Sequence, residues 1–487
     1  MMLQTIRREW FSRPVREMLA GAVATFALIP EVIAFSFAAG VDPQVGLFAS
    51  FVIGVVIAFS GGRPAMISAA AGSVALVAAP LVHSHGLPYL LAAGLLAGLI
   101  QIAFGLLRLG VLMRFVSKSV RTGFVNALAI LIFSAQVPQI LGSGPVTYAV
   151  LAAGLAVIYL VPRLTTVIPS PLICILLLTS ASIVLHLPVK TVADLGHLPD
   201  GLPLFAWPQV PLTIETLRAI GGPALAIAIV GLLESLMTAS VVDDLTQTSS
   251  SKNRECAGLG IANLAASLFG GIAGCGMIGQ TVSNVKYGGR GRLSTLFAGA
   301  LLLFLMVVLK PWVSQVPVAA LVAIMVMVSI DTFDWSSLRT LVTHPKVSSA
   351  VMGATVVVTV VTSNLAIGVA VGVVLSGVFF AFKVARLLSV THMRDDIADR
   401  LVYTVTGQVF FASADAFIDA FDIQHAIGVE RVLIDVSAAH FWDVTAVAAL
   451  DKVVARFEVQ GAAVELVGVN RASATLIESL DRSAVAG

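Results

Sequence analysis

Long apolar stretches separated by short polar segments run through the first 390 residues of the chain. Seven stretches precede a polar, proline-containing connector at residues 187–222, and seven follow it. Each is close to the roughly 20 apolar residues with which a helix crosses a bilayer. The pattern predicts an α-helical polytopic membrane protein whose fourteen transmembrane segments lie at residues 16–39, 44–60, 66–82, 88–107, 115–136, 145–161, 169–187, 223–242, 255–269, 271–285, 293–310, 315–330, 347–362 and 365–388.

Residues 391–487 follow the pattern of a soluble domain instead. Apolar stretches of strand length alternate with helix-like segments, which predicts a small α/β domain. The strands are expected at residues 401–411, 431–436 and 463–467, and the helices at 414–424, 444–460 and 472–480. Asp443 is expected to cap the second helix, with a phosphorylated Thr445 as a functional alternative. The chain is thus predicted to hold a transmembrane domain at residues 1–390 and a second domain at 391–487.

The two blocks of seven stretches are related in pattern. An odd number of spans makes successive blocks enter the membrane from opposite sides, as inverted-topology repeats do. Each block has an acid in its opening span, Glu31 or Glu234, and an interrupted third span, at residues 67–73 or 270–284. Paired interruptions of this kind indicate a transporter's binding site near the middle of the membrane. We therefore predict two inverted repeats of seven segments, with two half-helices at the site.

Composition and charge also indicate a membrane protein. The chain is 58% hydrophobic and 11% charged, whereas about a quarter of the residues of soluble proteins are charged. With the N-terminus inside the cell, nineteen Lys and Arg residues fall in the predicted cytoplasmic segments and three, Lys190, Arg218 and Lys310, fall outside. Since such residues of short loops stay in the cytoplasm, the N-terminus and residues 391–487 are predicted to be cytoplasmic. We expect a multi-pass protein of the inner membrane whose first span is retained rather than cleaved as a signal peptide.

Residues 270–284 carry the clearest candidate chemistry. An irregular backbone inside a bilayer must be buried in protein or line an aqueous cavity. The helix that resumes near Met277 should present unpaired N–H groups and the positive end of its dipole, which suits an anion. Neutral donors flank both interruptions, with helix-to-helix hydrogen bonding as the structural alternative: Ser68 and Ser73 in one, and Gln280, Thr281 and Asn284 in the other.

Two other site classes are excluded. The glycines at 274, 276 and 279 match a dinucleotide-binding fingerprint, but no acid follows at the required spacing, so we exclude nucleotide binding. The three cysteines are scattered in or beside apolar stretches, which predicts neither a disulfide framework nor a metal site.

The acids Glu31 and Glu234 lie in spans with no basic residue at matching depth. An acid in the middle of the membrane is costly and marks ion or proton pathways, although it can also be a structural acceptor of hydrogen bonds. Protonation of such an acid removes its repulsion of a nearby anion, so proton and anion bind cooperatively. The pattern therefore favours proton-coupled anion transport.

Several motifs together resemble those of the SulP anion permeases, also called solute carrier family 26. They are PEVIAF at residues 30–35, AGVDP at 39–43, GLLESL at 231–236, NRE at 253–255, GIAN at 260–263 and FGGI at 269–272. The resemblance covers nearly the whole chain, and residues 391–487 resemble the STAS domain of these permeases. It implies fourteen segments in two inverted repeats, a core domain that moves against a gate domain, an anion held between the N-termini of segments three and ten, and a homodimer.

On this basis the candidate site follows residue by residue. The expected substrate-binding residues are Ser68, Ala71, Gly72, Ser73, Gly279, Gln280 and Thr281. Glu31 and Glu234 are expected to couple transport to protons. We expect no catalytic residue, metal, other cofactor or nucleic-acid partner, and hence no enzyme activity.

The substrate class remains open between alternatives. Many family members have a basic residue where this chain has Gln280, and the missing cation favours a small organic acid carried with a proton. The predicted function is proton-coupled symport of a C4-dicarboxylate such as fumarate or succinate. The alternatives are a bicarbonate, sulfate or chloride permease, with sodium as the other candidate coupling ion, and an anion sensor that signals through the STAS domain to a cytoplasmic protein.

Overall fold

The computed structural model describes residues 9–141, 143–164, 170–194, 198, 201–343, 346–395, 400–422, 424 and 429–485. It divides into two compact units, Met1–Val373 and Val374–Gly487. Each unit is described by itself.

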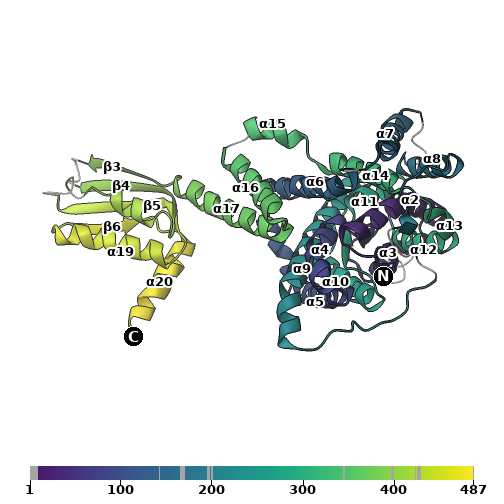
Figure 1. The fold of residues 1–487 in the computed structure, drawn as a ribbon. Helices are drawn as coiled ribbons and strands as arrows, with labels where there is room; N and C mark the ends of the chain where they lie inside the picture. Colours follow the sequence, from purple (N-terminus) through teal and green to yellow (C-terminus); the bar gives the residue numbers. More distant parts are fainter. Residues whose placement is uncertain are drawn as a thin grey trace. The chain divides into compact units, whose positions relative to one another are not determined.

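The first unit is a bundle of helices interrupted by two short strands (Figure 1). Every predicted transmembrane stretch corresponds to a helix or to a strand followed by a helix. The helices are α2 (Pro14–Ala38), α3 (Pro43–Ser60), α4 (Gly72–His85), α5 (Leu87–Leu106), α6 (Lys118–Ile140), α7 (Pro145–Leu160), α8 (Ser170–Val184), α9 (Ile214–Thr246), α10 (Lys252–Leu268), α11 (Ile278–Lys286), α12 (Arg292–Val308), α13 (Lys310–Val313), α14 (Val318–Thr332), α15 (Ser336–Thr343), α16 (Lys346–Thr362) and α17 (Leu365–Ala385), the last of which crosses the boundary between the units.

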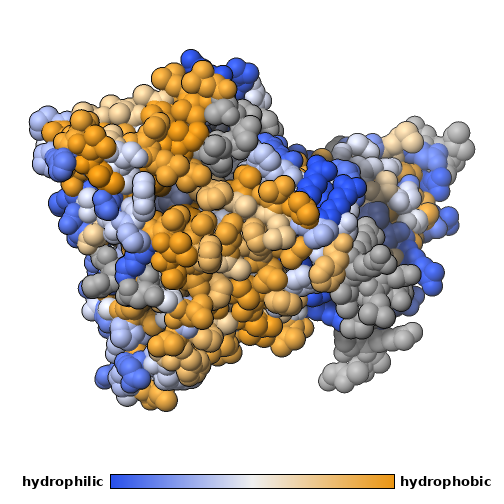
Figure 2. Space-filling view, turned by 90° about the vertical axis from the view of Figure 1, so that its right-hand side faces the viewer, coloured by the Kyte–Doolittle hydropathy of each residue, from blue (hydrophilic) through white to orange (hydrophobic). Residues whose placement is uncertain are grey.

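Many of these helices can meet lipid. Among the described residues, eight helices are long and apolar enough to cross a membrane, and α8, α12 and α16 are shorter apolar helices. Figure 2 shows a broad hydrophobic surface with hydrophilic residues gathered at its borders. The helical membrane fold is therefore confirmed, while the count of fourteen spans stays a prediction.

The connector before the second repeat is shorter than predicted. Its expected end at residue 222 is wrong, because α9 begins at Ile214 and its N-cap, Thr213, accepts a hydrogen bond from the Thr216 N–H at 3.3 Å. Pro223, where the predicted span begins, lies inside α9. A proline removes one backbone donor, and helices packed in a bundle tolerate it where neighbours compensate.

The second unit is an α/β domain, as predicted. Its sheet has the order β3-β4-β5-β6, with β3 antiparallel to β4 and the other neighbours parallel. The strands are β3 (Ser389–Asp395), β4 (Arg400–Val409), β5 (Arg431–Phe441) and β6 (Ala463–Val467), and the helices are α18 (Ala414–Asp419), α19 (Val444–Val459) and α20 (Arg471–Val485). The sequence pattern missed β3, whose mostly exposed residues lack a clear alternation.

Aromatic side chains fill the core of this domain. Tyr403, Phe417 and Phe457 are fully buried between the sheet and the helices. The Tyr403 hydroxyl donates to the Asp422 carbonyl at 2.9 Å, and burial raises the pKa of Tyr403 to about 12. Asp443 caps α19 as predicted, since its side chain accepts from the Ala446 N–H at 2.9 Å.

Candidate transport site

Two interrupted segments meet at the centre of the first unit. Strand β1 (Ser68–Ala70) precedes α4, strand β2 (Gly274–Gly276) precedes α11, and the strands pair antiparallel with Ala69 opposite Cys275. A side chain at Gly274 would collide with the Ala69 carbonyl, so the close approach of the strands requires glycine there. The sequence prediction of a helix resuming near Met277 is confirmed by α11.

Side chains from neighbouring helices satisfy the irregular backbone of β2. The Asn263 amide accepts from the Gly274 N–H at 2.8 Å and donates to the Gly274 carbonyl at 3.0 Å. Ser235 accepts from the Gly276 N–H at 2.8 Å, and Thr238 donates to the Gly276 carbonyl at 3.0 Å. The strand is therefore held by α9 and α10, as an irregular backbone at membrane depth requires.

Both half-helices begin without a side-chain cap, at Ala71 before α4 and at Met277 before α11. The first N–H groups of each helix have no partner within the helix, and they carry the positive end of its dipole. Residues from both starts, including Ser73 and Gln280, line one cavity of about 310 Å³. The positive ends of two helix dipoles therefore lie at the same cavity.

Three carboxylates line this cavity: Glu31 from α2, Glu234 from α9 and Asp331 from α14. Glu234 Oε2 accepts a hydrogen bond from the Ser73 hydroxyl and one from the Cys275 thiol, whose sulfur lies 3.1 Å away. Glu31 interacts with the Gln280 side chain. The opening-span acid of each repeat therefore meets the half-helix of the other repeat.

The rest of the lining is mostly apolar. It includes Phe35, Phe124, Leu128 and Ile132, and among the described lining residues there is no lysine, arginine or histidine. A bound anion must therefore be attracted by helix ends and neutral donors. Elsewhere among the described residues no group of three or more His, Cys, Asp or Glu could hold a metal ion.

Comparison with known proteins identifies the family. Residues 15–151 and 145–355 match the family model of the sulfate permeases, and residues 390–484 match that of the STAS domain. The chain belongs to the sulfate permease family. The predicted resemblance is thereby confirmed, and the chain is a multi-pass membrane anion transporter with a C-terminal STAS domain, not an enzyme.

Relatives and solved structures agree with this assignment. The permease is 52% identical over 476 residues to YbaR of Bacillus subtilis, which is named as a candidate sulfate transporter. The aligned residues cover 98% of this chain and 99% of the relative. The transmembrane domain of a cyanobacterial bicarbonate transporter, BicA, matches with a TM-score of 0.67 and 26% identity over 76% of this chain and 99% of that one. Murine Slc26a9 in its inward-facing state has the same fold, with a TM-score of 0.85 and 19% identity over 98% of this chain and 89% of that one.

The structure brings together most of the permease residues predicted for the site. Of the predicted binding and coupling residues, those that line the cavity are Glu31, Gly72, Ser73, Glu234, Gly279 and Gln280. Ser68, Ala71 and Thr281 are not among its lining residues. Their direct contact with substrate stays a prediction.

Thr281 and Asn284 have structural partners in the permease. The Thr281 hydroxyl accepts from the Ile67 N–H at 2.9 Å, which ties α11 to the segment before β1. The Asn284 amide donates to the Ala65 carbonyl at 2.9 Å and to Ser294 at 3.0 Å. Of these bonds, the one from Asn284 to Ser294 joins α11 to α12, which is the helix-to-helix bonding that sequence analysis gave as the alternative.

Asp331 is the lining acid that sequence analysis missed. It lies at the end of α14, one residue before Thr332, and both line the cavity. The available signal was an isolated acid at the end of an apolar stretch. That signal is weak, because acids are also common where a helix leaves the membrane.

Proposed function

We propose that this permease is a proton-coupled symporter of a small dicarboxylate such as fumarate or succinate. The observation that carries the proposal is that Glu31 and Glu234 share one cavity with two uncapped helix starts, without a cationic side chain among the described lining residues.

Electrostatics supports the coupling to protons. The two helix starts together supply roughly one positive charge. At an effective dielectric constant of about 20, two unit charges about 6 Å apart repel by roughly 3 kcal/mol, or about a hundredfold in affinity. Protonation of one lining carboxylate removes repulsion of that order, and by linkage a bound anion favours the proton by the same factor.

The walls of the cavity support a substrate with a carbon chain. Phe35, Phe124, Leu128 and Ile132 offer apolar contacts that an inorganic oxyanion cannot use. The volume of about 310 Å³ is at the lower end of the range for ligand pockets, roughly 300 Å³ to 1,000 Å³. A four-carbon diacid would place its carbons against these walls and its carboxylates near the helix starts.

Sulfate and bicarbonate are the second candidate substrates, and the names of relatives support them. YbaR is named as a candidate sulfate transporter at 52% identity, and BicA as a bicarbonate transporter at 26% identity. Sodium is the alternative coupling ion, and an anion sensor that acts through the STAS domain is the alternative to transport.

The excess of Lys and Arg in the predicted cytoplasmic segments supports a cytoplasmic N-terminus and a cytoplasmic STAS domain. The permease would lie in the inner membrane. A homodimer and a cytoplasmic protein partner of the STAS domain belong to the same proposal.

Uptake into proteoliposomes tests the function. The purified permease is reconstituted, and entry of labelled succinate, fumarate, sulfate, bicarbonate and chloride is measured with and without an inward proton gradient, and with sodium. We expect the gradient to raise succinate or fumarate uptake by up to about a hundredfold, as the loss of one charge repulsion implies. A protonophore should abolish the increase, and protein-free liposomes give the background.

Each other outcome identifies an alternative. Gradient-driven uptake of sulfate alone would replace the dicarboxylate while keeping proton coupling. Stimulation by sodium instead of protons would exclude the proposed coupling. Binding of an anion without any uptake would favour the sensor.

A further inference from the structure

A second cavity, of about 850 Å³, lies in the first unit and shares no lining residue with the transport cavity. It is formed by four segments that are far apart in sequence: the start of α2, the turn after α3, the loop after α9 and the turn after α11. All four are predicted to be cytoplasmic by the distribution of Lys and Arg. Its chemistry differs from that of the transport site.

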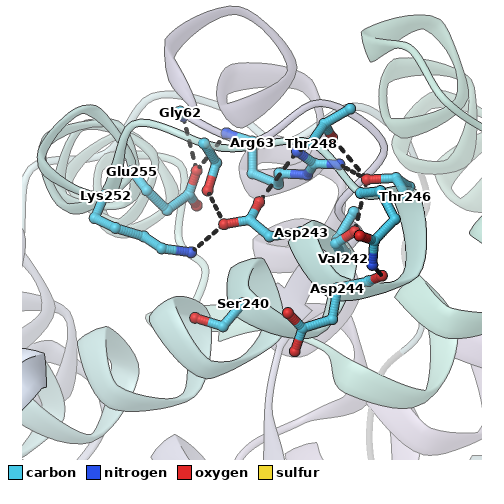
Figure 3. A network of polar contacts seen from close by, with 12 residues as sticks. Gly62, Arg63, Ser240, Val242, Asp243, Asp244, Thr246, Thr248, Lys252 and Glu255 are labelled. Carbon is cyan, nitrogen blue, oxygen red and sulfur yellow. Dashed lines mark hydrogen bonds and ion pairs between the residues drawn. The ribbon is translucent and has the colours of Figure 1, made fainter.

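Lining residues of this pocket, among them Gly62 and Arg63, take part in a partly buried ionic network (Figure 3). Asp243 lies between two cations, with Arg63 Nη1 at 3.1 Å and Lys252 Nζ at 2.8 Å. Glu255 Oε2 accepts from the N–H groups of Gly62 and Arg63, at 2.7 and 3.1 Å. Asp243 and Oε2 of Glu255 are therefore already paired within the protein, and neither acid lines the pocket.

Arginines give the pocket hydrogen-bond donors that the protein does not use. The Arg63 side chain is 6% exposed, and its Nη atoms donate to the hydroxyls of Thr246 and Thr248. Its Nε is buried and has no hydrogen-bond partner among the described residues. Within the described part of the chain, the Arg290 side chain donates hydrogen bonds only through Nη1, to two backbone carbonyls. The exposed Arg13 is the third arginine that lines the pocket.

Among the lining residues, a carboxylate oxygen of Glu17 is also without a hydrogen-bond partner in the described part of the chain. Glu17 is buried, and its Oε1 accepts from the N–H groups of Arg290 and Gly291, both at 2.8 Å. Its Oε2 is buried and has no partner among the described residues. The other lining acid, Glu9, is neutralised by Arg292 at 2.7 Å.

We propose that this pocket binds inorganic phosphate, whose singly and doubly charged forms at neutral pH both carry an O–H. Arg13, Arg63 and Arg290 would bind its anionic oxygens, because guanidinium groups match the geometry of phosphate. The O–H of the ligand would donate to Glu17. The ligand thus supplies both the acceptor that Arg63 lacks and the donor that Glu17 lacks.

The same arrangement discriminates against sulfate. Sulfate is fully ionised at neutral pH, so it would place an acceptor oxygen against the acceptor oxygen of Glu17. A buried pair of acceptors without a proton costs the desolvation of both. The pocket is therefore a phosphate site separate from the transport cavity, and its occupancy would tie the start of α2 to the loop after α9.

Calorimetry on the full-length permease in nanodiscs tests this site. Inorganic phosphate, glycerol 3-phosphate and sulfate are titrated at equal ionic strength and neutral pH. We expect inorganic phosphate to bind about tenfold more tightly than sulfate, the value of one well-placed hydrogen bond. Glycerol 3-phosphate, whose phosphate has mostly lost its proton at neutral pH, should bind more weakly than inorganic phosphate, and tighter binding of the monoester would contradict the role of the O–H.

Glu17→Gln is the decisive variant. Its amide oxygen can still accept from Arg290 and Gly291, while its NH2 group replaces the acceptor Oε2 with a donor. We expect phosphate and sulfate to bind this variant within about twofold of each other. Arg13→Gln, at an exposed position, should weaken phosphate binding about fivefold, whereas the matched control Arg254→Gln should leave it unchanged because Arg254 bonds the carbonyls of Phe59 and Ser60 instead.

Three further results would overturn the proposal. They are equal binding of sulfate and phosphate to the wild type, undiminished phosphate selectivity in Glu17→Gln, and loss of phosphate binding in Gln280→Ala with retention in Arg13→Gln. The last would assign the phosphate to the transport cavity. Because the assay measures binding at other residues, its outcome is independent of whether the permease carries dicarboxylates.

Discussion

The two half-helix starts have the same backbone geometry and different hydrogen-bond chemistry. At the start of α4, Ser73 donates to Glu234, which also accepts from Cys275. At the start of α11, Gln280 meets Glu31, and the Asp331 carboxylate lies on the same cavity. Glu234 is buried, whereas Glu31 is partly exposed to the cavity.

Repeat symmetry alone would give Glu31 and Glu234 the same role, whereas their different hydrogen-bond partners indicate two different roles. Two fixed donors hold the Glu234 carboxylate in place, so its main effect is on the shape and polarity of the site. Glu31 has fewer fixed partners, and its charge can respond to a substrate or a proton in the cavity. We therefore assign proton coupling chiefly to Glu31 and organisation of the site chiefly to Glu234.

The largest expected effect comes from replacing each acid by its amide. Glu31→Gln should keep succinate uptake but abolish its stimulation by an inward proton gradient, since the titrating group is gone. Glu234→Gln should lower uptake more than tenfold at every pH, because an uncharged amide oxygen accepts the hydrogen bonds of Ser73 and Cys275 less strongly than the carboxylate oxygen Oε2 that both of them bond. Uptake at pH 6 and pH 8 measures both. If the two variants gave the same pH profile, the proposed division of tasks would be wrong.

Loss of one donor tests the bond across the repeats. Ser73→Ala removes a hydrogen bond to a charged group, which typically contributes about 1.5–3 kcal/mol. We expect a correspondingly weaker binding of substrate, measured by calorimetry, with folding intact. Ser267→Ala is the matched control, because the buried Ser267 hydroxyl has no hydrogen-bond partner among the described residues and does not line the cavity. Equal losses in the two variants would remove the bond to Glu234 from the mechanism.

The outline of this site could be predicted from the sequence, because it depends on local signals. Glycines that interrupt an apolar stretch indicated the broken segment at residues 270–284, and β2 and α11 lie there. The acids Glu31 and Glu234 stood out because the spans around them are apolar. Six of the nine predicted binding and coupling residues line one cavity.

The partners within the site could not be predicted, because they come from long-range packing. Ser73 and Glu234 are separated by 161 residues, and no local pattern pairs them. The bond between the Thr281 hydroxyl and the Ile67 N–H could not be predicted either, since hydroxyls on a half-helix can face either the cavity or the protein. Three-residue strands such as β1 and β2 are also too short for a hydrophobic period to reveal.

Adding one methyl group at each half-helix start sharpens the comparison further. A Cβ at Gly72 would lie 2.6 Å from the Phe35 ring, whereas a Cβ at Gly279 would meet nothing within 4 Å. Gly72→Ala should therefore destabilise the permease by about 1–3 kcal/mol through overpacking and push Phe35 toward the substrate. Gly279→Ala should be neutral or slightly stabilising. Thermal unfolding in detergent compares the two, and a larger loss in Gly279→Ala would contradict the packing described here.

The smallest effect is expected at Cys275, the second donor to Glu234. A thiol is a weak donor, so Cys275→Ala should weaken succinate binding by about 1 kcal/mol or less, clearly below the effect of Ser73→Ala. Cys275→Ser keeps a donor at nearly the same place and should bind succinate within about twofold of the wild type. Cys256→Ala, at a buried cysteine of α10 that does not line the cavity, controls for the loss of a buried thiol. If Cys275→Ala were as damaging as Ser73→Ala while Cys256→Ala was harmless, both donors would hold Glu234 equally, and the carboxylate would be fixed by the pair rather than by the hydroxyl.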